Sequence, residues 1–181
     1  MGASDPRLTG STVDSDAIGS EEWVIVGTVG TVALVAGASS HYIQATSFGF
    51  DLPSDSVIDG ITASIGRLST VVTLRDTSTR LLKATVVAGS SKALATAWPA
   101  SLASASYGGA ADLWDTTWTP GNVNGGGFGV VLAVVNTGAV TAGVATSQNF
   151  SITVNFTTPE TGVTESVTRK AHGLTLGVGK C

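Results

Sequence analysis

Charged residues are scarce in this sequence. They make up 12% of the 181 residues, against about 25% in a typical soluble domain. Apolar residues account for 43%, and the mean hydropathy is +0.33. Disordered chains are poor in apolar residues and rich in charge, so this composition excludes disorder and predicts one domain with a substantial core. A monomer in free solution usually carries more surface charge, which favours a chain that works inside an assembly.

Long apolar runs, internal cysteines and basic blocks are also missing. The longest apolar run, residues 130–135, is far shorter than the roughly 20 residues that a membrane-spanning helix needs. The one cysteine, Cys181, allows neither an internal disulfide nor a cysteine metal site. The N-terminus lacks the pattern of a signal peptide, and no run of Lys and Arg indicates nucleic-acid binding. We therefore expect assembly in a cytoplasm and neither a nucleic-acid nor a membrane partner.

Acidic residues gather at the N-terminus. Residues 1–22 contain five acidic residues and one arginine, whereas the eight acidic and eight basic residues that follow cancel. Residues 1–22 have little to bury on their own, and residues 158–181 show no clear periodicity. Each segment is therefore predicted to be an extended arm, and residues 23–157 are predicted to form the folded domain between them.

The predicted domain is rich in residues that favour β-strands. The chain holds 22 Val and 25 Thr, and Gly and Pro separate its apolar segments. The pattern predicts strands at 23–36 (one or two), 41–50, 57–68 with a continuation over 70–75, 79–87, 113–118, 128–135 and 147–156. Residues 93–111 are predicted to be mostly irregular or strand, and 119–127 to be a loop that starts with one helical turn. Two strand faces are expected to be Val57, Asp59, Ile61, Ala63 and Ile65, and Phe150, Ile152, Val154 and Phe156.

Seven to nine short strands without a convincing helix are typical of an all-β sandwich or a closed barrel. We predict an antiparallel β-sandwich that is jelly-roll-like, with extended N- and C-terminal arms. Thr and Ser occupy many of the outward positions where Lys or Glu would be usual.

Several segments in the middle of the chain carry a family pattern. They read FGFDLPSDSVIDGITASIGR (48–67), DTSTRLLKA (76–84), SKALATAWP (91–99), YGGAADLWDTTWTPGNVN (107–124) and FGVVLAV (128–134). In this order they resemble small β-sandwich structural proteins of tailed bacteriophage virions, which typically carry a YGG-x-x-D-LWG motif and a WTP-x-x-VN-x-x-x-FG motif. Asp115 stands where that pattern often has Gly. The resemblance spans residues 23–156 and implies a virion component assembled in the host bacterial cytoplasm.

Two groups of carboxylates were weighed as chemical sites. Asp51, Asp55 and Asp59 offer the oxygen ligands that Ca²⁺ prefers, but they lack the D-x-D-x-D-G spacing and fit a proline-containing turn better. Asp112 and Asp115 flank Trp114, as the carboxylate pair of a glycosidase might flank an aromatic residue. The simpler interpretation is an edge strand whose Trp114 and Trp118 face the core while both Asp side chains face water.

The remaining motifs predict no site. His41 and His172 could serve in a Ser-His-Asp site, but the sequence contains no G-x-S-x-G nucleophile motif. His41 is instead expected to be exposed or to face a partner. Residues 177–180 fail as a phosphate loop because Leu174 replaces the first Gly, and residues 125–129 open into a strand rather than a helix. The sequons at Asn149 and Asn155 are interpreted as chance. We predict no catalytic, cofactor or metal site and no cofactor.

The four tryptophans Trp23, Trp98, Trp114 and Trp118 are predicted to fill the core. An exposed, coplanar Trp98 and Trp114 would instead favour a sugar-stacking platform.

From these observations and the resemblance we predict that the chain is a non-enzymatic virion protein, and we expect it to be a capsid decoration (cement) protein. It would bind the major capsid protein or other virion proteins through its sandwich and arms, and would associate with itself as a dimer or trimer. The alternative is a carbohydrate-binding, receptor-binding or connector protein of the phage tail, fibre or neck.

Overall fold

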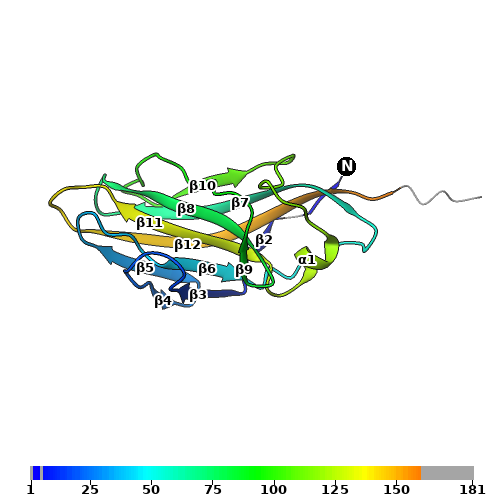
Figure 1. The fold of residues 1–181 in the computed structure, drawn as a ribbon, viewed down its shortest axis with the longest axis horizontal. Coiled ribbons are helices and arrows are strands. Elements are labelled where there is room, and N and C mark those ends of the chain that lie inside the picture. The colour runs from blue at the N-terminus through cyan, green and yellow to red at the C-terminus, as the bar shows by residue number, and fades with distance from the viewer. Residues whose placement is uncertain (1, 5, 160–181) are drawn as a thin grey trace, which may run out of the picture.

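The protein folds as two antiparallel β-sheets packed face to face. The structure is a computed structural model that describes residues 2–4 and 6–159, and over these residues it contains one seven-stranded and one five-stranded sheet. Figure 1 shows an elongated sandwich, with the N-terminus, the end of the last strand and the helix at the same end. The predicted all-β sandwich is confirmed.

The seven-stranded sheet has the order β10-β7-β12-β5-β4, and β1 and β2 also pair with β12. Its strands are β1 (Gly2–Ala3), β2 (Arg7–Leu8), β4 (Val24–Val26), β5 (Val29–Leu34), β7 (Val57–Ser69), β10 (Ala103–Gly108) and β12 (Gly143–Thr157). The five-stranded sheet has the order β3-β6-β11-β8-β9. Its strands are β3 (Ser11–Ser15), β6 (Tyr42–Thr46), β8 (Leu74–Lys83), β9 (Val86–Ala88) and β11 (Gly129–Asn136).

The described chain contains one short helix, α1 (Pro120–Asn124), at the place where the sequence predicts a helical turn. The side chain of the N-cap Thr119 accepts a hydrogen bond from the Asn122 N–H, and the Asn122 side chain accepts one from the Thr119 N–H. No helix of the described residues is long and apolar enough to cross a membrane.

Most strands lie where the residue pattern predicts them, but three segments differ. The single strand predicted over 79–87 is interrupted at Ala84 and Thr85, whose φ angles are 48° and 69°, and the chain turns there from β8 into β9. Residues 113–118 form turns rather than an edge strand, and residues 70–73 reverse the chain between β7 and β8 instead of continuing β7. In residues 113–118, Trp114 and Asp115 have φ angles of 58° and 55°. These left-handed conformations are incompatible with an extended ladder.

The N-terminal residues also differ from the predicted arm. β1 and β2 pair with β12 in one sheet, and β3 pairs over its whole length with β6 in the other. Residues 2–4 and 6–15 therefore belong to the sandwich and pair with both sheets, because backbone hydrogen bonding to existing strands does not require an apolar periodicity. The predicted C-terminal arm, 158–181, lies outside the described residues from residue 160 onward.

Two β-bulges decide which side chains enter the core. In β12, residues Gln148 and Ser151 pair with Gly66 and Ser64, so Asn149 and Phe150 lie opposite one residue of β7. Asn149 adopts φ 54°, and the inward face changes from odd to even positions, which turns Phe150, Ile152 and Val154 inward as predicted.

The second bulge corrects a predicted strand face. Asn155 pairs with Gly60 and Phe156 pairs with Ile58, so Asp59 has no residue opposite it. Ile58 is therefore buried and Val57 is exposed. The prediction that Val57 and Asp59 share the face of Ile61 was wrong, because an extra residue at this point inverts the alternation.

The core lies between the sheets and includes all four tryptophans, as predicted. Trp118, Phe128 and Phe50 form a chain of edge-to-face contacts, with ring centroids 5.5 and 5.6 Å apart. Such pairs stabilise a core beyond the area that they bury. Lys83 packs against the first ring of this aromatic series. Its ammonium lies 4.7 Å from the centre of the Trp118 ring and donates a hydrogen bond to the Thr117 carbonyl.

An ion pair joins the two sheets inside this core. Arg67 of β7 donates from Nη1 to both carboxylate oxygens of Asp76 of β8, at 3.0 and 3.1 Å. The Asp76 side chain has no exposed surface. It also accepts from Trp98 Nε1 at 2.7 Å, from the Tyr107 hydroxyl at 2.9 Å and from the Leu94 backbone at 3.0 Å.

Aromatic rings surround the cation of this pair. The Arg67 guanidinium lies 5.6 Å from the Trp98 ring and 5.9 Å from the Tyr107 ring, within the range of cation–π attraction. Burial, and after it the charge of Asp76, raises the pKa of Tyr107 far above its ordinary value, so its hydroxyl stays a donor. The carboxylate is thus compensated by one charge and three further donors.

Removing one member of this pair should destabilise the fold strongly. Arg67→Met keeps the volume but leaves the buried Asp76 carboxylate without its counter-charge, and we expect a loss of about 3–5 kcal/mol in the free energy of unfolding. Asp51→Asn, which changes an exposed carboxylate, should stay within about 0.5 kcal/mol of wild type. Urea unfolding followed by tryptophan fluorescence measures both. Equal stability of the two variants would contradict the assigned role of the pair.

Candidate functional site

Residues 107–124, which carry the strongest part of the family pattern, form the connection from β10 to α1. Their side chains hold this connection against both sheets. Tyr107 binds Asp76, and Trp114 donates from Nε1 to the Ile61 carbonyl of β7 at 2.9 Å. Trp118 donates to the Leu113 carbonyl at 3.0 Å. The motif side chains therefore have structural roles.

The end of this segment holds a second loop in place. Asn124 accepts from the Leu52 N–H at 2.8 Å and donates to the Leu52 carbonyl at 2.9 Å. One side chain thereby pairs with both backbone groups of Leu52, next to the predicted turn at Pro53. The WTP…VN and DLP segments, about 70 residues apart in the chain, are joined by this contact.

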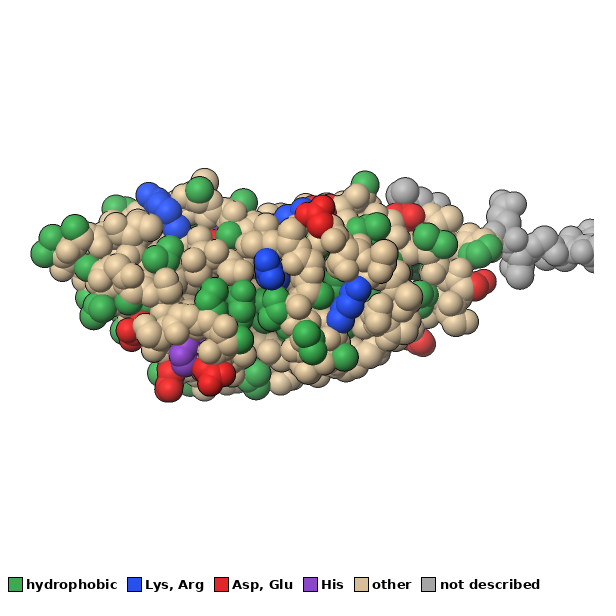
Figure 2. Space-filling view, in the orientation of Figure 1, with side chains coloured by type: hydrophobic (Ala, Val, Ile, Leu, Met, Phe, Trp, Pro, Cys, Tyr) green, Lys and Arg blue, Asp and Glu red, His purple; other side chains and the backbone are tan. Residues whose placement is uncertain are grey.

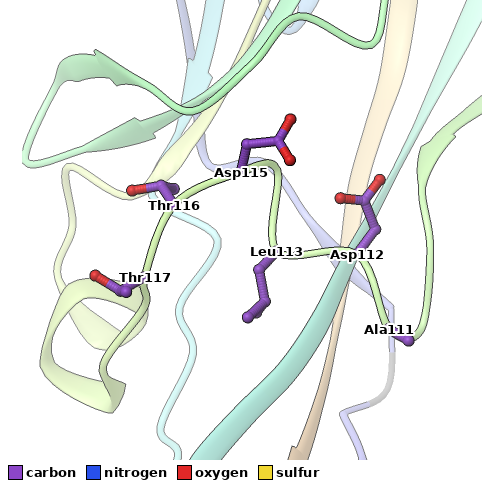
Figure 3. Close-up of a pocket in the computed structure, with 6 residues that line it drawn as sticks. All are labelled: Ala111, Asp112, Leu113, Asp115, Thr116 and Thr117. Atoms are coloured by element: carbon purple, nitrogen blue, oxygen red, sulfur yellow. The ribbon is translucent and has the colours of Figure 1, made fainter.

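A shallow hollow lies beside residues 111–117 (Figure 3), with a volume of about 530 Å³. Asp112 and Asp115 point to one side of the loop and Leu113 to the other. Lys92 lies between the two carboxylates, 2.9 Å from Asp112 and 4.0 Å from Asp115. Asp112 also accepts from the Trp114 backbone at 2.7 Å.

These contacts argue against general acid catalysis in the hollow. Burial raises the pKa of Asp112, but donation from Lys92 and from the Trp114 N–H outweighs it, so the net pKa is below its ordinary value. A glycosidase acid needs a raised pKa so that it is protonated near neutral pH. The hollow therefore presents an ion pair that fixes a loop, and the expected orientation, with Trp114 and Trp118 inward and both Asp side chains outward, is confirmed.

His41 was predicted to be exposed or to face a partner, and in the structure it is largely covered by the chain itself rather than exposed. Its side chain is 12% exposed, and Nδ1 lies 2.9 Å from Oδ2 of Asp14. Asp14 Oδ1 accepts from the Trp23 N–H at 2.8 Å, and Trp23 Nε1 donates to the His41 carbonyl at 2.9 Å. This closed ring of hydrogen bonds joins β3 and β6 of one sheet to the start of β4 in the other.

The ring does not form a nucleophilic triad. The neighbouring hydroxyl of Ser40 donates to the His41 carbonyl and accepts from the Val134 N–H, so it is not directed at the imidazole. Figure 2 shows acidic side chains beside a histidine on the lower edge of the molecule. Asp14, Asp16 and Glu22 all raise the pKa of His41 through their charge.

The other sequence candidates do not come together. Asp59 accepts from Thr157 Oγ1 at 2.7 Å, while Asp51 and Asp55 are exposed. Within the described residues, no three His, Cys, Asp or Glu side chains are grouped as a metal site requires. Residues 125–129 lead into strand β11, as predicted. His172, Cys181 and residues 177–180 lie outside the described part of the chain.

The residue pattern contained a signal for the buried ion pair that our prediction did not use. Arg67 continues the apolar face of Ile61, Ala63 and Ile65 at two-residue spacing, which places a charged residue on a face predicted to be buried. A charge in such a position requires a partner in the core. The identity of that partner, Asp76, depends on how the second sheet packs.

Comparisons with known proteins show no family for this chain. No family model matches the sequence, and no curated protein matches it. Among solved structures, the chain is similar to one described as "CBM4 structure and function", with a TM-score of 0.40 and 8% sequence identity. The match covers 81% of this chain and 92% of that chain. Likeness at this level carries no argument about function.

Gly108 of the YGG motif provides a test of the loop. Its φ is +73°, and an added Cβ would overlap the Ile61 carbonyl and Trp114 Nε1, the two atoms of a buried hydrogen bond. Gly108→Ala should cost about 2–4 kcal/mol in the free energy of unfolding. Gly109→Ala is the matched control, because no atom lies within 4 Å of its added Cβ. Urea unfolding compares them, and an unaffected Gly108→Ala would refute the close approach.

His41 should titrate above its ordinary pKa of 6.5. The hydrogen bond to Asp14 is the largest cause; burial opposes it, and the charges of Asp14, Glu22 and Asp16 add to it. A raised pKa means that the protonated ring stabilises the fold below pH 6.5, and that this contribution is lost as pH rises through the raised value. An NMR titration of the imidazole, assigned with His41→Gln, measures the pKa. Asp14→Asn should lower it, and an unchanged value would contradict the pairing.

Proposed function

We propose that this protein is a non-enzymatic structural protein of a phage virion, a decoration protein that binds the major capsid protein lattice. The observation that carries the proposal is that the reactive and aromatic side chains of the described residues are used internally. Asp76, His41 and Asp112 hold structural contacts, and the tryptophans are buried. The function that we propose therefore depends on the outer surface of the molecule. On the face shown in Figure 2, most of that surface is neither charged nor hydrophobic.

Such a surface suits a decoration protein, because a decoration protein works by lying over the capsid lattice and needs no reactive side chains. Each copy makes modest contacts, and their repetition across a lattice multiplies the binding. The resemblance of residues 23–156 to phage virion sandwiches supports this role. Three residues of the motifs that carry this resemblance, Tyr107, Trp114 and Asn124, make side-chain hydrogen bonds to other segments of the fold.

The acidic residues near His41 are the proposed electrostatic contact with the capsid. Asp16 and Glu22 are exposed, next to the strand β3 that anchors the N-terminal residues to the sandwich. Basic side chains on the capsid protein would complement them, which favours encounter and orientation more than affinity. Because β1 to β3 are part of the sheets, this contact is tested by changing charges and not by deleting the segment.

The alternative of a sugar-binding module on the tail or fibre has a specific requirement that the fold does not meet. Stacking on sugars needs an exposed aromatic platform, and Trp98 and Trp114 are 2% and 0% exposed. Burial of all four tryptophans therefore counts against that alternative.

Co-sedimentation with shells assembled from the major capsid protein of the same genome tests the proposal. The wild-type chain should pellet with the shells in a saturable manner that weakens with salt. Asp16→Asn with Glu22→Gln should bind about 2–30-fold more weakly, since exposed ion pairs contribute roughly 0.2–1 kcal/mol each. Asp51→Asn with Asp55→Asn removes the same charge from an exposed turn and should bind like wild type.

The outcomes separate the two parts of the proposal. No pelleting of the wild-type chain would refute the decoration role. Pelleting that is equally strong for both double variants would retain that role and refute the acidic contact. Binding of the chain to a glycan array, together with no binding to shells, would favour the sugar-binding alternative.

A further inference from the structure

Strand β10 forms an open edge of the seven-stranded sheet. It stands at one end of the strand order and pairs on one side with β7, over all six of its residues and without a register shift. Figure 1 shows β10 along the upper margin of the sandwich. Its burial alternates, with Ala105 and Tyr107 turned into the core and Ser104 and Ser106 exposed.

One set of backbone groups of β10 points away from β7. Ile61 of β7 donates to the Asp112 carbonyl and accepts from the Gly109 N–H, so the odd-numbered residues of this part of β7 point toward β10. They pair with the odd-numbered residues of β10. In an antiparallel ladder, the residues between such pairs direct both backbone groups outward. The N–H and C=O groups of Ser104 and Ser106 therefore lie along the free edge, and no hydrogen bond from residues 2–4 or 6–159 reaches them.

The other sheet edges are short, charged or covered. β1, β2, β4 and β9 have only two or three residues each, and β3 carries Asp14, whose carboxylate binds His41 and the Trp23 N–H. The segment after β9 covers the edge of β8, because the backbone of Lys92 and of Trp98 donates to its carbonyls. Shortness, charge, proline and bulges usually stop a sheet edge from pairing with another chain. β10 has none of these features.

We propose that β10 pairs antiparallel with β10 of a second copy of this chain, around a two-fold axis at Ala105. This axis places Ser104 opposite Ser106 of the second copy. Each such pair exchanges N–H···O=C hydrogen bonds in both directions. The outward groups of β10 are therefore complementary to themselves in this orientation, and the seven-stranded sheet continues from one copy into the other, as in other cases of strand addition.

The side chains of β10 favour a second copy over a strand of another protein. A two-fold axis brings residues near their own symmetry mates, so a charged edge would meet like charges, and β10 contains no charged residue. In this register Ala105 lies beside its own mate and Ala103 beside Tyr107, so no two large side chains meet. An edge that selects a different protein has pockets for alternate side chains. The exposed residues of β10 are Ala, Ser and Gly, which are too small to line a pocket.

The contact is small, so we expect reversible association. Pairing along one edge joins few residues, and interfaces below about 1,200 Å² are typically transient. The dimer should form at high protein concentration and dissociate on dilution. On the proposed capsid lattice, a weak contact of this kind would act between copies that are already held close together.

Analytical ultracentrifugation of the full-length chain over a concentration series tests this contact. The wild type should change from the 18.1 kDa monomer to a dimer as the concentration rises. Ser106→Pro removes an outward N–H that no described strand of the chain uses, and proline is tolerated at such edge positions. Because a symmetric contact loses one donor from each copy, the dimer should be at least about tenfold weaker. Ser106→Ala keeps the N–H and should dimerise like the wild type.

Amide hydrogen exchange followed by NMR identifies the edge directly in the wild type. The amides of Ser104 and Ser106 should exchange rapidly in dilute solution and become protected as the dimer forms. Those of Ala105 and Tyr107 point toward β7 and should be protected throughout. Thermal melts followed by tryptophan fluorescence check that both variants fold, and the exchange data decide the proposal if Ser106→Pro does not.

A wild type that stays monomeric would overturn the proposal, as would a trimer, a dimer that Ser106→Pro leaves unchanged, or a dimer in which Ser104 and Ser106 stay unprotected. Protection of both amides in the dilute monomer would also overturn it and would assign the edge to residues 160–181 of the same chain. Loss of shell binding in Ser106→Pro, without any wild-type dimer, would assign the edge to the capsid protein. Because the isolated chain is measured, failure of the dimer leaves the proposed decoration role standing.

Discussion

The carboxylate of Asp76 lies between the two sheets without access to water, and much of the fold is arranged around it. A buried charge is tolerated only when opposite charge and hydrogen-bond donors compensate for its lost hydration. Here the compensation comes from β7 through Arg67, from β10 through Tyr107 and from the loop between β9 and β10 through Trp98 and Leu94. The position of each of these segments is thereby tied to one group.

The same constraint explains why the connections of this sandwich are well defined although they are long. Trp114 and Trp118 turn into the core and donate to the backbone of Ile61 and Leu113, and Asn124 pairs with Leu52. The polar atoms of these three side chains enter the interior together with their hydrogen-bond partners, as is usual for buried polar groups. A small domain with few charges obtains its specificity from these internal hydrogen bonds and not from surface ion pairs.

The reactive side chains of the described residues are engaged in contacts within the protein, and this affects which functions they can perform. A site for catalysis needs groups that are held in place but left available to a substrate. In the described residues each of the candidate groups is held by a partner of its own, Asp112 by Lys92, His41 by Asp14 and Asp76 by Arg67. The proposed decoration role uses the weakly charged surface instead, where repetition of modest contacts would supply the affinity.

Composition and alternation by themselves determined the fold class, the buried tryptophans, the helical turn at Pro120 and the inward face of Phe150, Ile152 and Val154, because these depend on local preference and on burial of apolar area. The tertiary structure alone decided three things. The bulge at Asp59 inverted the face of β7, the pairing of β1 to β3 brought the N-terminal segment into the sheets, and packing of β7 against β8 gave Arg67 its partner Asp76. Each depends on which strands become neighbours, and neighbours far apart in the chain leave no local pattern in the sequence.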